Sequence, residues 1–382
     1  MIYIDTLNAL NQACAQWKTC TRIALDSEFM RVDTFYPKLA LIQINDGKQT
    51  SIVDPVRINR ESRGEATSET WQGFIDILVD PNITKILHSP SEDFDAFFSN
   101  LGVVPTPIFD TQLAAAMASM GGIMGYQKLV KALLDIELDK GETRSDWMQR
   151  PLSDNQLHYA ADDVNHLLEM ADLLQNKLES LERWQWVQSD CQAMVSDWID
   201  TQEQGYGLER IKKAWMLKAH QLNILNQLLN WREARCREVN KPRGHIVSDA
   251  IMIEIAMKAP TSLKQLGAIK GIRQPTVRKD GEKIIEIIQQ AQDMDKSQWP
   301  ERLPRPFNQV AGEWFKKMRA LVNKKAEALD IPPEFVARKR SLEQMLREAY
   351  PNGPFKIPQS LQGWRETVIG NDLLDLLKKL AK

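Results

Sequence analysis

The amino-terminal third of the chain alternates short apolar runs with segments of helical periodicity. Apolar, β-branched runs predict strands over residues 23–26, 39–44, 50–53, 85–88 and 108–109. The pair Asp46-Gly47, between the second and third runs, predicts a tight hairpin turn. Helical spacing predicts helices over residues 71–78, from 91 onward, after 111, and from 153 towards 178. Three strands that can pair antiparallel, followed by alternating helices and strands, predict a mixed sheet in an α/β domain.

From about residue 183 the strand signals vanish, and the apolar positions follow helical spacing. Two adjacent apolar rows within residues 215–231 predict one long helix whose wide stripe belongs to a core. Three prolines within residues 293–306 indicate a linker between two helical modules. The pattern therefore predicts an α/β domain over 1–180, a connecting helix over 181–208, a helical domain over 209–290, a linker over 291–306 and a second helical domain over 307–382.

Length and composition agree with a multidomain globular protein. The 382 residues exceed what one ordinary core accommodates. The chain has no run of about 18 apolar residues and no basic segment followed by an apolar core, so neither a membrane span nor a signal peptide is expected. The four cysteines are scattered without a C-x-x-C pair, which predicts a reduced, cytoplasmic protein and disfavours a zinc site.

The net charge of −2 conceals two halves of opposite sign. Residues 1–182 contain 15 Lys+Arg and 27 Asp+Glu, whereas residues 183–382 contain 34 and 24. An acidic half joined to a basic half favours a catalytic or metal-holding part and a part that binds polyanions. Solvated surfaces would explain the same split, so charge alone leaves nucleic-acid binding open.

The stretch IALDSEFM, residues 23–30, begins with the strand predicted over 23–26 and contains two carboxylates, Asp26 at the strand end and Glu28 just beyond it. Side chains alternate along a strand, so Asp26 and Glu28 point to one face. Like charges a few ångströms apart raise each other's pKa, and a bound cation would relieve the repulsion. An isolated D-x-E pair more often marks a strand end followed by a polar turn, so a metal site requires more carboxylates.

Further acidic residues stand near the ends of other predicted elements. Asp110 is equally explained as the cap of the following helix. Tyr159 and Asp163 are four residues apart and share one helix face. An all-oxygen ligand set suits Mg²⁺ or Mn²⁺ rather than Zn²⁺, and two such ions serve the attack of water on a phosphodiester. The candidate set comprises Asp26, Glu28, Asp93 and Asp163.

These motifs, in this order, resemble those of a known family. Asp26-x-Glu28, His88-x-x-x-x-Asp93 and Tyr159-x-x-x-Asp163 resemble the three exonuclease motifs of the DEDD superfamily. Four longer stretches resemble the bacterial ribonuclease D family: LDSEFMRVDTFYPKLALIQI (25–44), LHSPSEDFDAF (87–97), FDTQLAA (109–115) and LDKGETRSDWMQRPLS (138–153). The two helical modules resemble the HRDC domains of that family, the first more clearly through SLKQLGAIKGI (262–272).

The resemblance implies a ribonuclease-H-like exonuclease domain followed by two all-α HRDC-like domains. It implies metal-dependent 3′→5′ hydrolysis of RNA that releases 5′-mononucleotides, with the 3′ ends of tRNA precursors as substrate. The four carboxylates would hold two divalent ions, Mg²⁺ or Mn²⁺, and Tyr159 would position or deprotonate the attacking water. Phe29 and Met30 would pack on the terminal base or sugar, although core packing explains them equally.

The basic stretch in the first helical module suggests where RNA is bound. Arg232, Arg235 and Arg237 would contact phosphates and supply sequence-independent affinity. Helical bundles with basic faces also bind proteins, so this assignment has an alternative. RNA is the expected partner, no dedicated protein partner or membrane is expected, and the chain is expected to be a monomer.

The alternatives to an exoribonuclease are a DNA exonuclease, a non-catalytic RNA-binding protein, and a dehydrogenase or kinase. A DNA exonuclease would use the same chemistry, since no residue reveals a contact to a 2′-OH. A non-catalytic RNA-binding protein with a decayed nuclease domain is disfavoured because all four carboxylates and the tyrosine are present. A dehydrogenase or kinase is excluded because the chain lacks G-x-G-x-x-G and G-x-x-x-x-G-K-[ST].

The third motif is ambiguous, since DEDD enzymes place either Tyr four residues or His five residues before the last Asp. Tyr159 and His158 satisfy both spacings relative to Asp163. Four residues of helix turn about 400° and five turn about 500°, so helix geometry favours Tyr159. The wider resemblance also favours Tyr159 as the catalytic residue.

Overall fold

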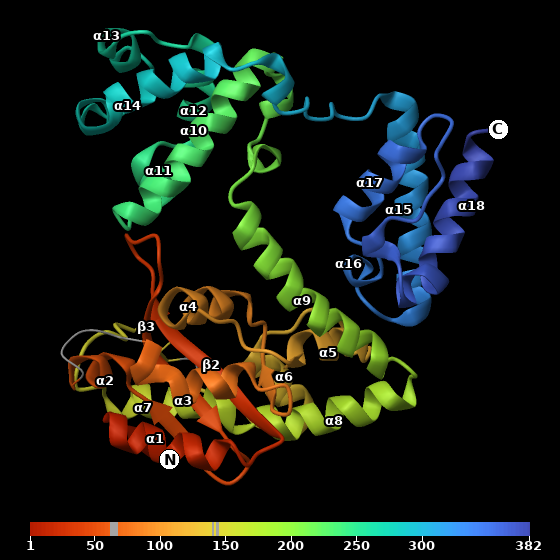
Figure 1. The fold of residues 1–382 in the computed structure, drawn as a ribbon. Coiled ribbons are helices and arrows are strands. Elements are labelled where there is room, and N and C mark those ends of the chain that lie inside the picture. Colours follow the sequence, from red (N-terminus) through yellow and green to blue (C-terminus); the bar gives the residue numbers. More distant parts are fainter. Residues whose placement is uncertain (62–67, 140, 143–144) are drawn as a thin grey trace. The chain divides into compact units, whose positions relative to one another are not determined.

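The computed structural model describes residues 1–61, 68–139, 141–142 and 145–382, so residues 140, 143 and 144 of the stretch 138–153 lie outside it. The described chain forms two compact units (Figure 1). The first comprises Met1–Met30, Lys38–Ser196 and Phe307–Lys382, and the second comprises Arg31–Pro37 and Asp197–Pro306.

A six-stranded mixed sheet forms the centre of the first unit, in the order β1-β4-β3-β2-β5-β6. β3 pairs antiparallel with β2 and β4, whereas β5 and β6 continue parallel to β2, and β1 is parallel to β4. The predicted mixed sheet and its hairpin are confirmed, and Gly47 in the turn adopts a φ of 85°. The strands are β1 (Ile2–Ile4), β2 (Arg22–Met30), β3 (Lys38–Asn45), β4 (Thr50–Val53), β5 (Thr84–Leu87) and β6 (Ile108–Asp110).

Two strand predictions are corrected by long-range pairing. β1 was not expected, because three residues carry too little pattern, and it forms by pairing with β4. β2 does not end at Asp26 but continues to Met30, because β3 pairs with it past Glu28. The register shifts between Glu28 and Phe29, so the strand is irregular just beyond the second carboxylate.

Helices flank this sheet and bury its apolar surface. Trp17, Phe74 and Phe97 are buried and make ring contacts that join three of the helices, α1, α3 and α4. The helix expected from 153 to 178 is two helices, because the backbone of His166, at φ −107° and ψ −4°, ends the first. The helices are α1 (Leu7–Trp17), α2 (Pro55–Glu61), α3 (Ser68–Val79), α4 (Ser91–Leu101), α5 (Thr111–Met117), α6 (Tyr126–Leu134), α7 (Asp154–Asn165), α8 (Leu167–Ser180) and α9 (Trp184–Gln204).

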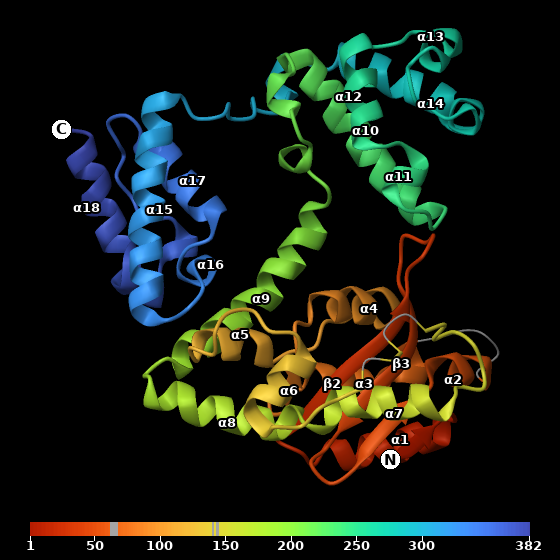
Figure 2. The same cartoon turned by 180° about the vertical axis from the view of Figure 1, so that it is seen from behind.

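Helix α7 lies along one face of the sheet and contacts β2, β3 and β4 (Figure 2). Its start is set by a capping box, in which Ser153 Oγ accepts from Gln156 N at 3.2 Å and Gln156 Oε1 accepts from Ser153 N at 3.0 Å. The buried residues between α7 and the sheet form one apolar cluster: Ala40, Leu41, Ile52, Trp147, Ala160 and Ala161.

The carboxyl-terminal helical module belongs to the first unit and packs against the region of α9. The rings of Trp186 and Trp364 are stacked with centroids 4.4 Å apart, and Arg365 forms an ion pair with Asp190 at 2.6 Å. Arg183 donates from Nη2 to the Leu329 carbonyl at 2.8 Å. The module comprises α15 (Gln309–Leu329), α16 (Pro333–Val336), α17 (Lys339–Ala349), a π-helical turn (Glu366–Gly370) and α18 (Asn371–Leu380).

The second unit is helical, as its periodicity predicts. The long helix α10 (Ala219–Glu238) buries its wide apolar stripe, including Leu225 and Leu228, against α12 (Asp249–Lys258) and α14 (Gln274–Asp293). Short helices α11 (Arg243–Ile246) and α13 (Leu263–Gly267) complete the bundle. The segment Arg31–Pro37 is held by Asn240, whose Oδ1 accepts from the backbone N–H groups of Phe35 and Tyr36 at 2.9 and 3.0 Å.

Candidate active site

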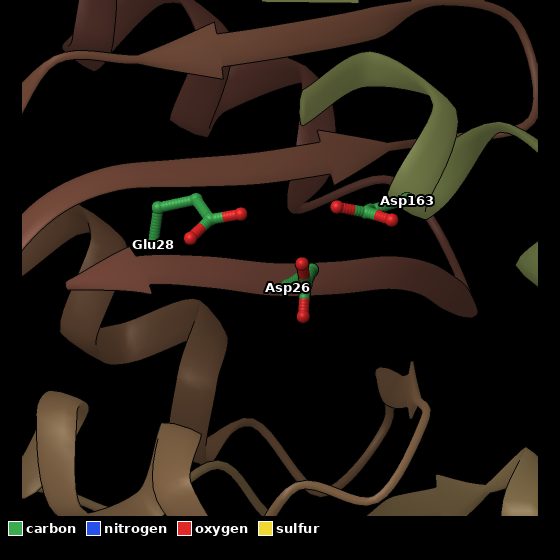
Figure 3. A group of neighbouring side chains, drawn as sticks. All are labelled: Asp26, Glu28 and Asp163. Atoms are coloured by element: carbon green, nitrogen blue, oxygen red, sulfur yellow. The ribbon is translucent and has the colours of Figure 1, made fainter. Parts of the chain in front are cut away.

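Three carboxylates converge on the face of the sheet that α7 covers (Figure 3). Asp26 and Glu28 project from β2, and Asp163 projects from α7. One oxygen of each lies within 4.8 Å of the others, and all three side chains are half-buried. The expected same-face placement of Asp26 and Glu28 is therefore observed, and α7 adds the third carboxylate.

Asp93 stands at the edge of this cluster, in the first turn of α4. Its side chain is buried, and its Oδ1 accepts a hydrogen bond of 2.5 Å from the hydroxyl of Ser27, which lies between Asp26 and Glu28. The position near a helix N-terminus favours its negative charge. The structure thus brings three of the four predicted carboxylates together, and Asp93 lies beside them with its carboxylate bonded to Ser27.

Burial and mutual repulsion raise the free energy of the ionised form of these carboxyl groups. Burial, with the charges of Asp163 and Asp93, raises the pKa of Glu28 to about 8. Burial, with the charges of Asp162 and Asp93, raises the pKa of Asp163 to about 7. Burial, with the neighbouring carboxylates, raises the pKa of Asp26 well above its usual range.

The pKa of Asp93 is raised as well. Burial raises it to about 6, and the hydrogen bond from Ser27 opposes that rise. A divalent cation would remove the repulsion among the four groups, and an all-oxygen donor set is what Mg²⁺ and Mn²⁺ prefer. The site can therefore hold a divalent metal ion.

Tyr159 lies one turn before Asp163 on α7, and both line a cavity of about 870 Å³. The phenol ring is half-buried and tilted against the ring of Trp147. His158 is exposed. Of the two residues that satisfied the spacing rules, the structure places Tyr159 in the cavity wall beside the cluster.

His88, the first residue of the second motif, supports the wall of this cavity. Its Nδ1 lies 2.9 Å from Thr111 Oγ1 and its Nε2 lies 3.1 Å from the Met124 carbonyl. Burial lowers the pKa of His88 to about 4, so the ring is neutral near pH 7. The ring also contacts the ring of Tyr126, whose hydroxyl donates to the Asp162 carbonyl at 2.6 Å.

Asp110 has the capping role that the sequence left open. Its Oδ1 accepts from Gln112 N at 2.9 Å, at the start of α5, and from Ser89 N at 2.8 Å. The second bond ties the strand end of β6 to the turn before α4. Both hydrogen bonds to Asp110 therefore come from backbone N–H groups. The bond from Ser89 fixes the turn before α4, the helix that carries Asp93 in its first turn.

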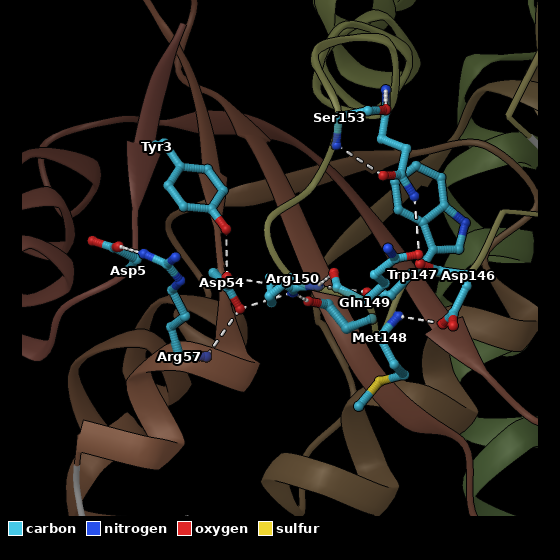
Figure 4. A network of polar contacts seen from close by, with 12 residues as sticks. Tyr3, Asp5, Asp54, Arg57, Asp146, Trp147, Met148, Gln149, Arg150 and Ser153 are labelled. Atoms are coloured by element: carbon cyan, nitrogen blue, oxygen red, sulfur yellow. Dashed lines mark hydrogen bonds and ion pairs between the residues drawn. The ribbon is translucent and has the colours of Figure 1, made fainter.

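A buried ion pair holds the segment before α7 against the sheet (Figure 4). Arg150 donates to both oxygens of Asp54, at 2.6 and 2.8 Å, and to the carbonyls of Trp147 and Ala40 at 2.7 and 2.9 Å. Burial would raise the pKa of Asp54, but hydrogen bonds from Arg150 and Tyr3 outweigh it and hold that pKa low. Sequence reasoning missed this network, because no linear pattern pairs residues 54 and 150.

The residues proposed to contact RNA are placed differently from one another. Phe29 and Met30 are half-buried at the end of β2. Arg235 is ion-paired with Asp280 at 2.9 Å, and Arg237 with Glu233 at 3.1 Å.

The prediction that Arg232 contacts RNA is wrong. Its side chain is fully buried and bonded to Asp249 and to the Val247 carbonyl, because this position of α10 faces the core. Many other basic side chains of the second unit are exposed, and five of them lie on α13, α14 and the turn between them. They are Lys264, Lys270, Arg273, Arg278 and Lys279.

Comparison with known families agrees with this architecture. Residues 1–179 match the 3′–5′ exonuclease family, residues 221–288 match the HRDC domain, and residues 312–373 match the carboxyl-terminal HRDC domain of ribonuclease D. The mixed sheet, its carboxylate cluster and these matches define a 3′–5′ exonuclease that carries HRDC domains.

Relatives of nearly the same length identify the family. The chain is 40% identical to ribonuclease D of Pseudomonas paraeruginosa, covering 97% of this chain and 96% of that one. It is 30% identical to ribonuclease D of Escherichia coli, covering 98% of both. The crystal structure of E. coli RNase D, described as an exoribonuclease involved in structured RNA processing, matches with a TM-score of 0.88 at 29% identity, over 100% of this chain and 99% of that one. The chain belongs to the ribonuclease D family and is a 3′–5′ exoribonuclease.

A more distant structure shares the fold. A protein from Bifidobacterium adolescentis matches with a TM-score of 0.68 at 21% identity, over 99% of this chain and 97% of that one.

The expected fold class, an exonuclease domain followed by helical HRDC domains, is confirmed. No helix in the described part of the chain is long and apolar enough to cross a membrane.

Proposed function

We propose that this exoribonuclease trims the 3′ ends of structured RNAs, tRNA precursors among them, and releases 5′-mononucleotides. The observation that carries the proposal is the convergence of Asp26, Glu28 and Asp163 within 4.8 Å, with Asp93 beside them. The structured class of substrate is supported by the E. coli relative, which is described as acting on structured RNA. Four cysteines without a disulfide support a reducing location such as the cytoplasm.

The four carboxylates would hold two divalent ions, Mg²⁺ or Mn²⁺. Bound ions of this kind neutralise the phosphodiester charge and activate water at neutral pH. Tyr159 would orient the attacking water through its hydroxyl, since it lines the same cavity as Asp163. Ser27 would keep Asp93 directed towards the site through their 2.5 Å hydrogen bond.

The second unit would bind the body of the RNA through exposed basic residues of α13 and α14. Lys270, Arg273 and Arg278 are exposed and form no ion pair among the described residues. Phosphate contacts by such side chains give sequence-independent, salt-dependent affinity. This assignment replaces the buried Arg232 and keeps Arg235 and Arg237 in supporting positions.

The experiment is hydrolysis of end-labelled nucleic acids by the full chain. RNA and DNA of one sequence, each with a 3′ or a 5′ label, are incubated with Mg²⁺, Mn²⁺ or EDTA. We expect mononucleotides from the 3′ end of RNA with either metal and none with EDTA. Equal rates on DNA would contradict the preference for RNA, and hydrolysis in EDTA would contradict the metal site.

A further inference from the structure

Gln43, at the centre of β3, is a buried polar residue without a partner. Its side chain is completely inaccessible to solvent, and neither its Oε1 nor its Nε2 makes a hydrogen bond. Native proteins pair nearly all buried amides, because burying an amide without a partner is costly. Such a group is expected to have a partner in some state of the protein.

The register of the sheet places Gln43 beside the carboxylate cluster. Gln43 is the direct partner of Asp26 in the antiparallel pair of β3 with β2. Directly opposed residues of an antiparallel pair project to the same face, with Cβ atoms about 5 Å apart. The Gln43 amide therefore lies on the face from which Asp26 projects.

The residue that pairs with Gln43 on its other side, in β4, packs in the apolar cluster beneath α7, so α7 covers this part of the sheet. On its second side Gln43 pairs with Ile52 of β4, whose side chain packs in the apolar cluster with Trp147 and Ala160. The indole Nε1 of Trp147 is also buried without a partner. Among the described residues of the first unit, the buried side-chain atoms without a partner belong to these two residues, Gln43 and Trp147.

We propose that Gln43 is a positioning residue of the metal centre, in which its Nε2 donates a hydrogen bond to the Asp26 carboxylate when the site binds a cation. This inference rests on the proposed metal-dependent function. A neutral amide suits the place, because it adds a donor for Asp26 without adding another charge. A glutamate would increase the repulsion, and a lysine would compete with the metal ion.

The test compares Gln43→Met and Gln43→Leu with the wild-type full chain. Binding of Mn²⁺ is measured by calorimetry, and turnover is measured on a short single-stranded RNA. Partners of metal ligands typically contribute 10–100-fold to metal affinity. We expect Mn²⁺ affinity to fall at least tenfold in both variants, and kcat to fall while KM for RNA is unchanged.

Thermal unfolding without metal separates this role from simple packing. Removing an unpaired buried amide should leave the melting temperature of the metal-free protein unchanged or raise it. Ile44→Val is the matched control, because Ile44 is buried on the same strand and faces the other side of the sheet. The control should leave Mn²⁺ affinity and kcat unchanged.

Two results would overturn the role of Gln43. The first is unchanged Mn²⁺ affinity in both variants, and a lower melting temperature of the metal-free variants would then indicate that the amide binds a structural water. The second is a loss of affinity in only one variant, which would indicate packing. Failure of the wild-type chain to bind Mn²⁺ would instead contradict the proposed function.

Discussion

The phenol ring of Tyr159 packs against the indole ring of Trp147, with ring centroids 6.0 Å apart and planes inclined by 38°. Trp147 is held in turn by Arg150, which donates to its carbonyl while forming the buried pair with Asp54. Residues distant in the chain thus support the side chain that lines the cavity of the candidate active site.

Replacing Arg150 by Met should destabilise the protein by about 3–5 kcal/mol, because Asp54 would be left charged and buried without its partner. Asp54 is 0% and Arg150 is 6% exposed. Urea unfolding measures the change. Arg22→Met is the control, because Arg22 pairs with the exposed Asp172 and such surface pairs contribute about 1 kcal/mol or less. Equal effects of the two substitutions would contradict the structural role of Arg150.

Tyr159→Phe should reduce kcat about 10²-fold or more, because the hydroxyl proposed to orient the attacking water is lost. His158→Ala should change kcat little and should leave the rate profile intact between about pH 5 and 8, where histidines titrate. Paired pH–rate profiles of the two variants provide the measurement. The opposite pattern would assign the protein to the histidine class of DEDD enzymes.

Asp26→Asn should abolish RNA hydrolysis, because it removes one of the proposed metal ligands while keeping the side-chain volume. The metal-free variant should be at least as stable as the wild type, since one charge leaves a repelling cluster. Turnover and thermal unfolding in EDTA test the two statements. Asp172→Asn, on the exposed surface of α8, should retain activity. Near wild-type turnover of Asp26→Asn would refute the assigned site.

The stability of the metal-free protein should fall as pH rises from about 5 to 8. The pKa of Glu28 is raised to about 8 and that of Asp163 to about 7. A carboxyl group whose pKa is higher in the folded than in the unfolded state contributes stability that is present at low pH and lost as pH rises through the folded pKa. Melting temperatures in EDTA across this range measure the effect.

Two controls accompany this titration. Addition of Mg²⁺ should reverse the loss above pH 7, because the ion binds the ionised carboxylates of the folded state. Glu28→Gln should flatten the profile by removing one titrating group. A melting temperature that is independent of pH and of Mg²⁺ would count against the electrostatics of the cluster.

Replacing Lys270, Arg273 and Arg278 together by Ala should weaken binding of structured RNA. The steepness of its salt dependence should fall by about one unit for each phosphate that is no longer neutralised. Binding isotherms at several salt concentrations measure both quantities. Lys258→Ala should have little effect, because Lys258 is paired with Glu254 at 3.0 Å. An unchanged salt slope in the triple variant would place the RNA-binding surface elsewhere.

The sequence by itself determined the elements whose signals are local. Apolar runs located most strands of the mixed sheet, Asp46-Gly47 located its hairpin, and alternation along β2 placed Asp26 and Glu28 on one face. Helical spacing placed Tyr159 one turn from Asp163. These features follow from backbone periods of 2.0 and 3.6 residues, which neighbouring side chains along the chain express directly.

Only the tertiary structure decided which distant residues meet. The strand register places Gln43 directly opposite Asp26. Folding of the segment before α7 brings Arg150 into contact with Asp54. Packing of α10 turned Arg232 inward, although the sequence around it suggested a basic surface. Such pairings depend on how elements pack, and a sequence period specifies the face of an element without specifying the partner that covers it.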